Sequence, residues 1–340
     1  MRTKIVYVVT STPKDIYLEQ ALVSATSLRL HMPKGTAHVT LLTDNKTDKS
    51  LTGNRAQILD LIDEKVVVDY EDNMSMYDRS RYLKTGLREY VKGDLLYIDC
   101  DTIIARPLYD IDNFDCELGS VLNCHVPFNL NPFRNWHEQQ AQKIGFQSVY
   151  NEIDYFNGGF CYAKDTPVAY EFFQRWRKNW LASKDHGIPN DEPGFNESNI
   201  EMNHVLKIIP GEWNCQLKYG LRCFHNVKII HFLCTQYVGS GVECAYFFMN
   251  QSVYERIKEE GCIAEDIMDK IKHPMDCFSQ ASMIIGGNEL YFQHTNEYWH
   301  LLGIIMDNSW ISSLMKWSIG VCDKLMYLRN KITKKSKKNK

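Results

Sequence analysis

The sequence predicts an α/β fold with a mostly parallel central sheet flanked by helices. Over the first hundred residues, short apolar runs rich in β-branched and aromatic residues alternate with longer segments of helical periodicity. Such runs are typical of buried strands, and strands that are joined through helices run parallel with right-handed crossovers. The strands predicted here are 4–10, 38–42, 66–68 and 95–98, and the helices between them are 17–30, 54–63 and 79–91.

The alternation continues past residue 100 and then changes. Further strands are predicted at 119–122, 156–162, 207–209 and 227–232, with a helix at 167–180. After about residue 241, helical and irregular segments replace the strands. We therefore expect an α/β domain over 1–240, a mainly helical extension over 241–332 and a basic, disordered tail over 333–340.

The last predicted helix covers residues 301–332, where apolar residues recur at three- and four-residue steps, and a lysine-rich tail follows it. An amphipathic helix with a basic end can lie on an anionic membrane, where each lysine near the surface contributes on the order of 1 kcal/mol. The same pattern also fits a helix that packs on the core and is followed by a solvated tail. Both interpretations stay open, and the first makes peripheral membrane contact a candidate.

Composition narrows the class of protein. Of the 340 residues, 44% are apolar and 24% are charged, and a net charge of -3 lacks the basicity typical of a nucleic-acid binder. The eleven cysteines are scattered and form no C-x-x-C pair, which favours reduced thiols over a disulfide framework. The first apolar run is too short for a signal peptide, and no apolar stretch reaches 18 residues. We expect a cytoplasmic enzyme, free or peripheral at the inner face of the membrane.

Two aspartates, Asp99 and Asp101, follow the predicted strand 95–98 and carry the strongest chemical signal. Because side chains alternate along a strand, we expect both carboxylates on the same side. Neighbouring carboxylates repel each other unless a divalent cation neutralises them or they share a proton. Thr10 and Asp44 also lie at ends of predicted strands, the edge where an open parallel sheet binds its ligands.

Three interpretations fit this pair of aspartates. A sugar-nucleotide transferase would use them to hold Mg²⁺ or Mn²⁺ against a diphosphate. A phosphohydrolase of the haloacid dehalogenase type would use Asp99 as nucleophile and Asp101 as general acid and base. An exposed turn without chemistry also fits, since aspartate is common in turns. The phosphohydrolase motif has threonine or valine where this chain has Ile103, and it usually lies on the first strand, so this interpretation is disfavoured.

Short segments spread in order over about residues 4–240 carry a further signal. They are Lys4-Ile5-Val6-Tyr7-Val8-Val9-Thr10, Ser80-Arg81-Tyr82-Leu83-Lys84, Tyr97-Ile98-Asp99-Cys100-Asp101-Thr102, Phe156-Asn157-Gly158-Gly159-Phe160, Asp191-Glu192-Pro193-Gly194-Phe195-Asn196 and Ile229-Ile230-His231-Phe232. This series resembles the GT-A-fold glycosyltransferases of family eight, which include glycogenin and bacterial lipopolysaccharide galactosyl- and glucosyltransferases.

The resemblance implies the GT-A fold and roles for individual residues. Asp99, Asp101 and His231 would hold the ion, Mn²⁺ or Mg²⁺, because a neutral imidazole beside two carboxylates is a set that Mn²⁺ tolerates. The nucleotide sugar would be bound by Thr10, Asp44, Arg81, Lys84, Asp99, Gly158 and Gly159. Asp191, Glu192 and Asn157 would form the catalytic set at the sugar. The two glycines would leave room for a ligand close to the backbone.

The activity that the resemblance implies is transfer of a hexose, glucose or galactose, from a UDP-sugar to a glycan or glycolipid acceptor, with retention of configuration. Such reactions serve lipopolysaccharide or polysaccharide synthesis. The chain departs from the family at Cys234 and Tyr237, which replace the glycine and lysine that hold the leaving diphosphate, and at Glu192, which replaces a glutamine. The phosphate contacts must then come from elsewhere, with Lys218, Arg222 and the backbone near 239–241 as candidates, or else stabilisation of the leaving group is weak. A catalytically inactive sugar-nucleotide-binding protein is a further alternative.

Overall fold

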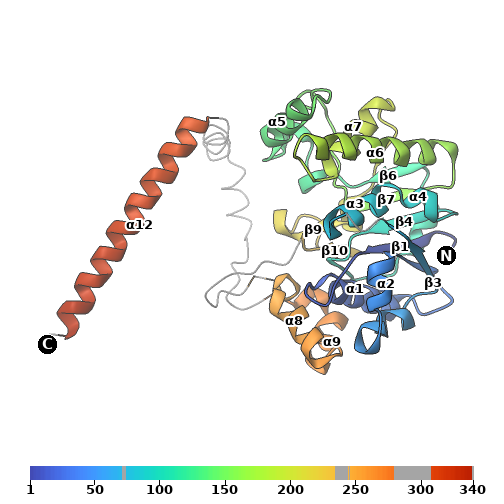
Figure 1. The fold of residues 1–340 in the computed structure, drawn as a ribbon, viewed down its shortest axis with the longest axis horizontal. Helices are drawn as coiled ribbons and strands as arrows, with labels where there is room; N and C mark the ends of the chain where they lie inside the picture. The colour runs from blue at the N-terminus through green and yellow to red at the C-terminus, as the bar shows by residue number, and fades with distance from the viewer. Residues whose placement is uncertain (71–73, 234–243, 245, 279–307, 339–340) are drawn as a thin grey trace. The chain divides into compact units, whose positions relative to one another are not determined.

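The computed structural model describes residues 1–70, 74–233, 244, 246–278 and 308–338 of the chain (Figure 1). The chain divides into two compact units, residues 1–284 and 285–340. The domain boundary that the sequence predicts at residue 240 lies outside the described residues. Every site residue that the sequence predicts belongs to the first unit.

A seven-stranded sheet runs through the described part of the first unit. In spatial order its strands are β3 (Glu64–Val68), β2 (Val39–Asp44), β1 (Lys4–Val9), β4 (Leu95–Ile98), β7 (Phe160–Ala163), β6 (Leu118–Ser120) and β8 (Lys207–Ile208). The first four strands are mutually parallel, β7 is antiparallel to both of its neighbours, and β8 is parallel to β6. The predicted α/β class with a mostly parallel sheet is therefore confirmed.

Strand β1 has its side chains divided between two apolar clusters, one on each face of the sheet. Tyr7 and Val9 pack with helix α1 (Tyr17–His31), whereas Val6 and Val8 pack with α3 (Met76–Thr85) and α6 (Pro167–Asp185). Figure 1 shows helices on both sides of the sheet. A strand buried on both faces needs the continuous apolar run seen here, and each buried aliphatic side chain contributes about 1.5–3 kcal/mol.

A second sheet of three strands brings distant segments together at the end of β4. It consists of β5 (Thr102–Ile104), β10 (Ile229–His231) and β9 (Cys215–Gln216), in that spatial order. Strand β10 is antiparallel to β5, with His231 opposite Thr102, and parallel to β9. This pairing sets His231 next to the Asp99–Asp101 turn, although the two lie far apart in the sequence.

Two predicted helices differ from the structure. The segment predicted as one helix over 79–91 forms α3 and the short α4 (Leu87–Tyr90), which meet at Gly86. The Arg177 guanidinium occupies the space where a Cβ on Gly86 would stand, and it donates to the carbonyl oxygen of Tyr82 near the end of α3. The segment predicted as a helix over 54–63 forms a 3₁₀ helix at Gly53–Asp60.

The described part of the first unit contains five further α-helices. They are α2 (Asn45–Ser50), α5 (Arg134–Ile144), α7 (Glu192–Glu201), α8 (Gln251–Glu260) and α9 (Glu265–Lys272). Ile257 of α8 and Ile267 and Ile271 of α9 belong to the same apolar cluster as α1. Residues that follow the predicted boundary at 240 therefore share the core of the α/β unit.

The second unit contains one described helix, α12 (Ser309–Lys338). It corresponds to the predicted helix over 301–332, of which residues 301–307 lie outside the described residues. The helix continues to Lys338, so most of the segment that the sequence predicts as a disordered tail is helical. Among the described residues, no helix combines the length and apolar character needed to cross a membrane.

Candidate metal and nucleotide-sugar site

The two aspartates lie in the turn between β4 and β5. Strand β4 ends at Ile98, so the expected alternation along a strand does not place the carboxylates. The hydrogen bonds of the turn place them instead. The backbone N–H of Asp99 donates to the Gly159 carbonyl oxygen at 3.0 Å, and the backbone N–H of Phe232 donates to the Asp101 carbonyl oxygen at 3.2 Å. These bonds anchor the turn to β7 and β10 and direct both carboxylates toward His231.

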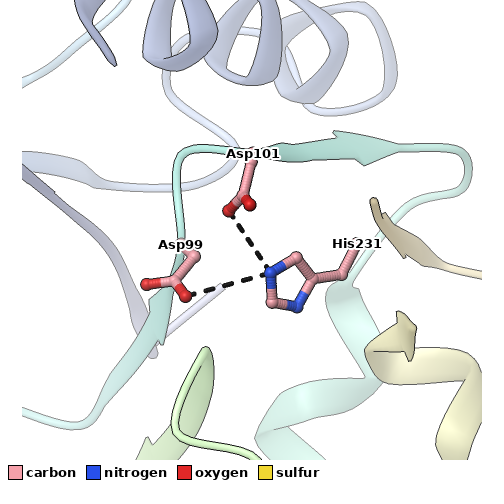
Figure 2. A group of neighbouring side chains, drawn as sticks. All are labelled: Asp99, Asp101 and His231. Carbon is pink, nitrogen blue, oxygen red and sulfur yellow. Dashed lines mark ion pairs between the residues drawn. The ribbon is translucent and has the colours of Figure 1, made fainter. Parts of the chain in front are cut away.

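His231 faces both carboxylates with the same ring nitrogen. Its Nε2 lies 3.3 Å from Asp101 Oδ1 and 3.9 Å from Asp99 Oδ2 (Figure 2). One ligand atom from each of the three residues lies within 4.8 Å of the other two. Burial alone lowers the pKa of His231, but Asp101 and Asp99 reverse the effect, and the pKa is raised overall. The structure thus brings together the three residues that the sequence predicts as a metal site.

The chemistry of these three side chains suits a divalent ion. Carboxylate oxygens are the ligands preferred by Mg²⁺ and Mn²⁺, and Mn²⁺ also accepts an imidazole nitrogen. The two aspartates keep some exposure to the cleft, with 28% and 19% of their side chains accessible, whereas His231 is buried. An ion held by these three residues would therefore keep open positions on the solvent side for a further ligand.

Neighbouring groups fix the orientation of the Asp99 carboxylate. Its Oδ1 accepts from the Tyr97 hydroxyl and lies 3.5 Å from the Lys84 ammonium. Both partners approach the same oxygen, which leaves Oδ2 facing His231. Tyr97 therefore acts as a positioning group, although it lies inside the predicted motif without an assigned role.

Lys84 and Arg81 both pair with Asp191, and Arg81 keeps 26% of its side chain exposed. Lys84 Nζ lies 3.0 Å from Asp191 Oδ2, and Arg81 Nε lies 3.0 Å from Asp191 Oδ1. Burial raises the pKa of Asp191, but Lys84 and Arg81 outweigh it and hold the pKa below its usual value. Lys84 is 5% exposed and bridges Asp191 to Asp99, so it connects the predicted catalytic set to the metal ligands.

Glu192 is held by two amides. Asn123 Nδ2 donates to its Oε1 at 3.2 Å, and Asn157 Nδ2 donates to its Oε2 at 3.4 Å. Burial and the adjacent Asp191 carboxylate raise the pKa of Glu192 to about 7. Near neutral pH this carboxyl group can therefore both donate and accept a hydrogen bond, as a glutamine amide does.

The raised pKa predicts a pH dependence of stability. In the unfolded chain Glu192 titrates near its ordinary pKa of 4.5, whereas in the fold it keeps its proton up to about pH 7. The contribution of the protonated Glu192 to the free energy of unfolding is therefore complete below pH 4.5 and is lost as the pH rises to 7. We expect the stability of the wild type to fall relative to that of Glu192→Gln over this range, as chemical denaturation at several pH values would measure. A constant difference would contradict the shift.

The two glycines of the predicted motif have different surroundings. A Cβ on Gly159 would lie 2.4 Å from His231 Cε1 and 2.6 Å from Asp99 Oδ2, inside the metal site. A Cβ on Gly158 would lie 3.6 Å from Asp191 Oδ2 and 3.8 Å from Lys84 Nζ, which are ordinary contacts. Gly159 is thus required by the site, and Gly158 has room for a small side chain.

A cleft of about 760 Å³ opens over Asp99 and Asp101, whereas His231 is not part of its described lining. Among the described residues, its lining includes Thr10 at the end of β1, Tyr77 and Arg81 of α3, the Asp99–Asp101 turn and Lys258 of α8. Clefts of about 300–1,000 Å³ accommodate small-molecule ligands and cofactors. The predicted nucleotide residue Thr10 therefore lies in the cleft.

Asp44, the other strand-end residue predicted to bind the nucleotide, has a structural environment. It is fully buried, its Oδ1 accepts from the backbone N–H of Thr47 at the start of α2, and its Oδ2 pairs with Arg79. It is not part of the described cleft lining. Lys218 and Arg222 are likewise absent from that lining, whereas Cys234, Tyr237 and residues 239–241 lie outside the described residues.

Sequence reasoning missed several residues of the site. Asn123 holds Glu192, Asn214 contacts His231, and Lys258 supplies a cation to the cleft. None of them belongs to a motif, and each reaches the site through tertiary structure alone. A lone asparagine or lysine in a sequence does not indicate which site its side chain will reach.

Comparisons with known proteins find similarity in structure only. No protein-family model matches the chain, and no curated protein matches it. The apo form of mouse xyloside xylosyltransferase 1 is 14% identical over 72% of this chain and 100% of that chain, with a TM-score of 0.49. Galactosyltransferase LgtC, in complex with donor and acceptor sugar analogs, is 15% identical over 79% and 100%, with a TM-score of 0.45. Glycosyltransferase GlyE of Streptococcus pneumoniae TIGR4 is 13% identical over 83% and 67%, with a TM-score of 0.46.

Proposed function

We propose that this protein is a metal-dependent glycosyltransferase of the GT-A fold, which transfers a hexose from a UDP-sugar to a hydroxyl group of a glycan or glycolipid. The observation that carries the proposal is the meeting of Asp99, Asp101 and His231 beside a cleft large enough for a nucleotide sugar. The motif series described above supplies the reaction class. Mn²⁺ is the ion that this set of ligands favours, with Mg²⁺ as the alternative.

The charges that line the cleft indicate that a diphosphate needs a bound divalent ion in order to bind there. Of the described residues, five carboxylates line it, from Asp15, Asp99, Asp101, Glu255 and Glu259, against three cations, from Lys14, Arg81 and Lys258. Such a lining repels a diphosphate, which is itself an anion. A divalent ion bound at the aspartates would neutralise this repulsion and stabilise the departing nucleoside diphosphate.

The residues around Asp191 are proposed to hold the donor sugar. Asp191 is kept ionised by Lys84 and Arg81, so its oxygens can only accept hydrogen bonds, whereas Glu192 can also donate near neutral pH. Asn157 is fixed by its bond to Glu192. We further propose that the configuration at the sugar is retained and that the leaving diphosphate takes the proton of the acceptor hydroxyl, so that no enzyme nucleophile is required.

The proposal is tested by a thermal-shift measurement on the full chain with UDP, Mn²⁺, both or neither. We expect UDP to stabilise the protein only when Mn²⁺ is present, because the cleft is acidic without the ion. A ligand at 100 times its Kd stabilises a protein by about 2.7 kcal/mol, which such a measurement resolves.

The same preparation separates the alternatives. Hydrolysis of small phosphoesters without any effect of UDP would contradict the proposal in favour of a phosphohydrolase. Stabilisation by UDP and Mn²⁺ without transfer to water or to any acceptor would favour the inactive sugar-nucleotide-binding protein. A screen of UDP-glucose and UDP-galactose with glycan and glycolipid acceptors then identifies donor and acceptor.

We also propose that α12 lies on an anionic membrane surface. Trp310, Leu314, Trp317, Val321 and Leu325 follow one another at steps of three or four residues, so they share one face of the helix, and all are exposed. The end of the helix is rich in lysine. An apolar face with tryptophan and a cationic end is typical of helices that lie in the membrane interface.

Deletion of residues 309–340 is expected to abolish sedimentation of the protein with anionic liposomes. Trp317→Glu should weaken it strongly, because a carboxylate on the apolar face opposes burial in the interface. Ser312→Glu introduces the same charge on the opposite face and serves as the matched control. Equal sedimentation of the deleted and intact chains would contradict the membrane proposal.

A further inference from the structure

A buried amide contacts the imidazole of His231 on the side away from the two aspartates. Asn214 Oδ1 lies 2.8 Å from His231 Nδ1, and both side chains are almost completely inaccessible to solvent. Figure 2 shows this second ring nitrogen turned away from the two aspartates. Asn214 directly precedes β9, whose parallel pairing with β10 sets Cys215 beside Ile230. The position of the Asn214 backbone is thus fixed by the second sheet.

The direction of each hydrogen bond around Asn214 follows from one backbone group. The N–H of Gly159 can only donate, and it lies 3.0 Å from Asn157 Oδ1, so that atom must be the amide oxygen. The same oxygen lies 3.0 Å from the amide of Asn214, which must therefore present its NH₂ group there. The carbonyl oxygen of Asn214 is then the atom that faces His231 Nδ1 and accepts its proton.

We propose that Asn214 is a positioning residue that keeps the proton of His231 on Nδ1 and the lone pair of Nε2 directed at Asp99 and Asp101. A neutral imidazole has one protonated nitrogen and one with a lone pair, and only the latter can bind a metal ion. The groups that hold the other nitrogen decide which tautomer and ring orientation is present. This inference deepens the proposed function and rests on it, since it concerns the same metal site.

Mn²⁺ titration of the full-length protein, by calorimetry or by the electron paramagnetic resonance of the free ion, tests this role. Asn214→Ala removes the acceptor without removing a metal ligand, and we expect affinity for Mn²⁺ to fall about 10- to 100-fold. Gln216→Ala is the matched control. It deletes a buried amide of β9 that bonds to Leu122 and Cys124 and not to His231, so affinity for Mn²⁺ should stay near that of the wild type. Unchanged affinity in a folded Asn214→Ala protein would overturn the inference.

The tautomer itself is measured in the metal-free wild type, which removes any dependence on the folding of a variant. We expect the ¹⁵N chemical shifts of His231, recorded at a pH where the ring is neutral, to show the proton on Nδ1. A proton on Nε2 would overturn the inference whatever the protein does with Mn²⁺. Conversely, a wild type that has the Nδ1 proton and binds no Mn²⁺ would contradict the proposed function and leave the hydrogen-bond direction established.

Discussion

Replacing Asp101 with asparagine is expected to abolish metal-dependent turnover of the UDP-sugar. Asp101 Oδ1 is the carboxylate oxygen nearest to His231 Nε2, at 3.3 Å, and the substitution keeps the size of the side chain while removing its charge. A neutral amide is a weaker ligand for a hard divalent ion than a carboxylate. Loss of groups that merely support a ligand typically costs 10- to 100-fold in affinity, so loss of a ligand charge should cost at least about 100-fold.

This expectation is checked by Mn²⁺ titration together with a donor-turnover assay. Asp110→Asn is the matched control, since it makes the same chemical change at an exposed carboxylate that pairs with Lys228. Exposed ion pairs contribute about 0–1 kcal/mol to stability, so this variant should fold and bind Mn²⁺ as the wild type does. Unchanged Mn²⁺ affinity and turnover in Asp101→Asn would remove the metal site from the proposed mechanism.

The three residues predicted as metal ligands lie together for a reason that strand alternation does not give. Alternation along a strand is the wrong explanation for the shared direction of Asp99 and Asp101, because β4 ends at Ile98 and both residues lie in the following turn. The carboxylates converge because β5 returns beside β10, opposite His231. Local periodicity could not predict this second sheet, since its strands are very short and the pairing of β5 with β10 joins segments more than 100 residues apart.

The fold was more accessible to sequence reasoning than the contacts inside the site. Long apolar runs located β1, β2 and β4 because a strand buried on both faces has few alternatives to a continuous apolar sequence. The charged residues could be assigned to the site but not to their partners. Lys84 and Arg81 were expected to face a ligand. Both pair with Asp191, and Arg81 lines the cleft as well; the pairing depends on where α7 begins relative to α3.

Gly159→Ala is expected to disrupt the metal site as strongly as the loss of a ligand. Its Cβ would lie 2.4 Å from His231 Cε1 and 2.6 Å from Asp99 Oδ2, distances that real Cβ atoms do not adopt. The ring cannot easily withdraw, because it is buried and its Nδ1 is bonded to Asn214. Overpacking of this kind costs about 1–3 kcal/mol, and the ligand atoms would have to move to relieve it. We expect lower stability and little remaining affinity for Mn²⁺.

The neighbouring glycine makes this prediction specific. Gly158→Ala adds the same methyl group one residue earlier, where the nearest atoms are at ordinary contact distances of 3.6 and 3.8 Å, so affinity for Mn²⁺ should be kept. Neither glycine has a positive φ, and any difference between the two variants therefore reports the space beside the ligands and not backbone strain. Equal Mn²⁺ affinity in both variants would mean that His231 and Asp99 do not hold the ion in this arrangement. Nothing in the sequence separates Gly158 from Gly159. Only the tertiary position of His231, next to Gly159, distinguishes them.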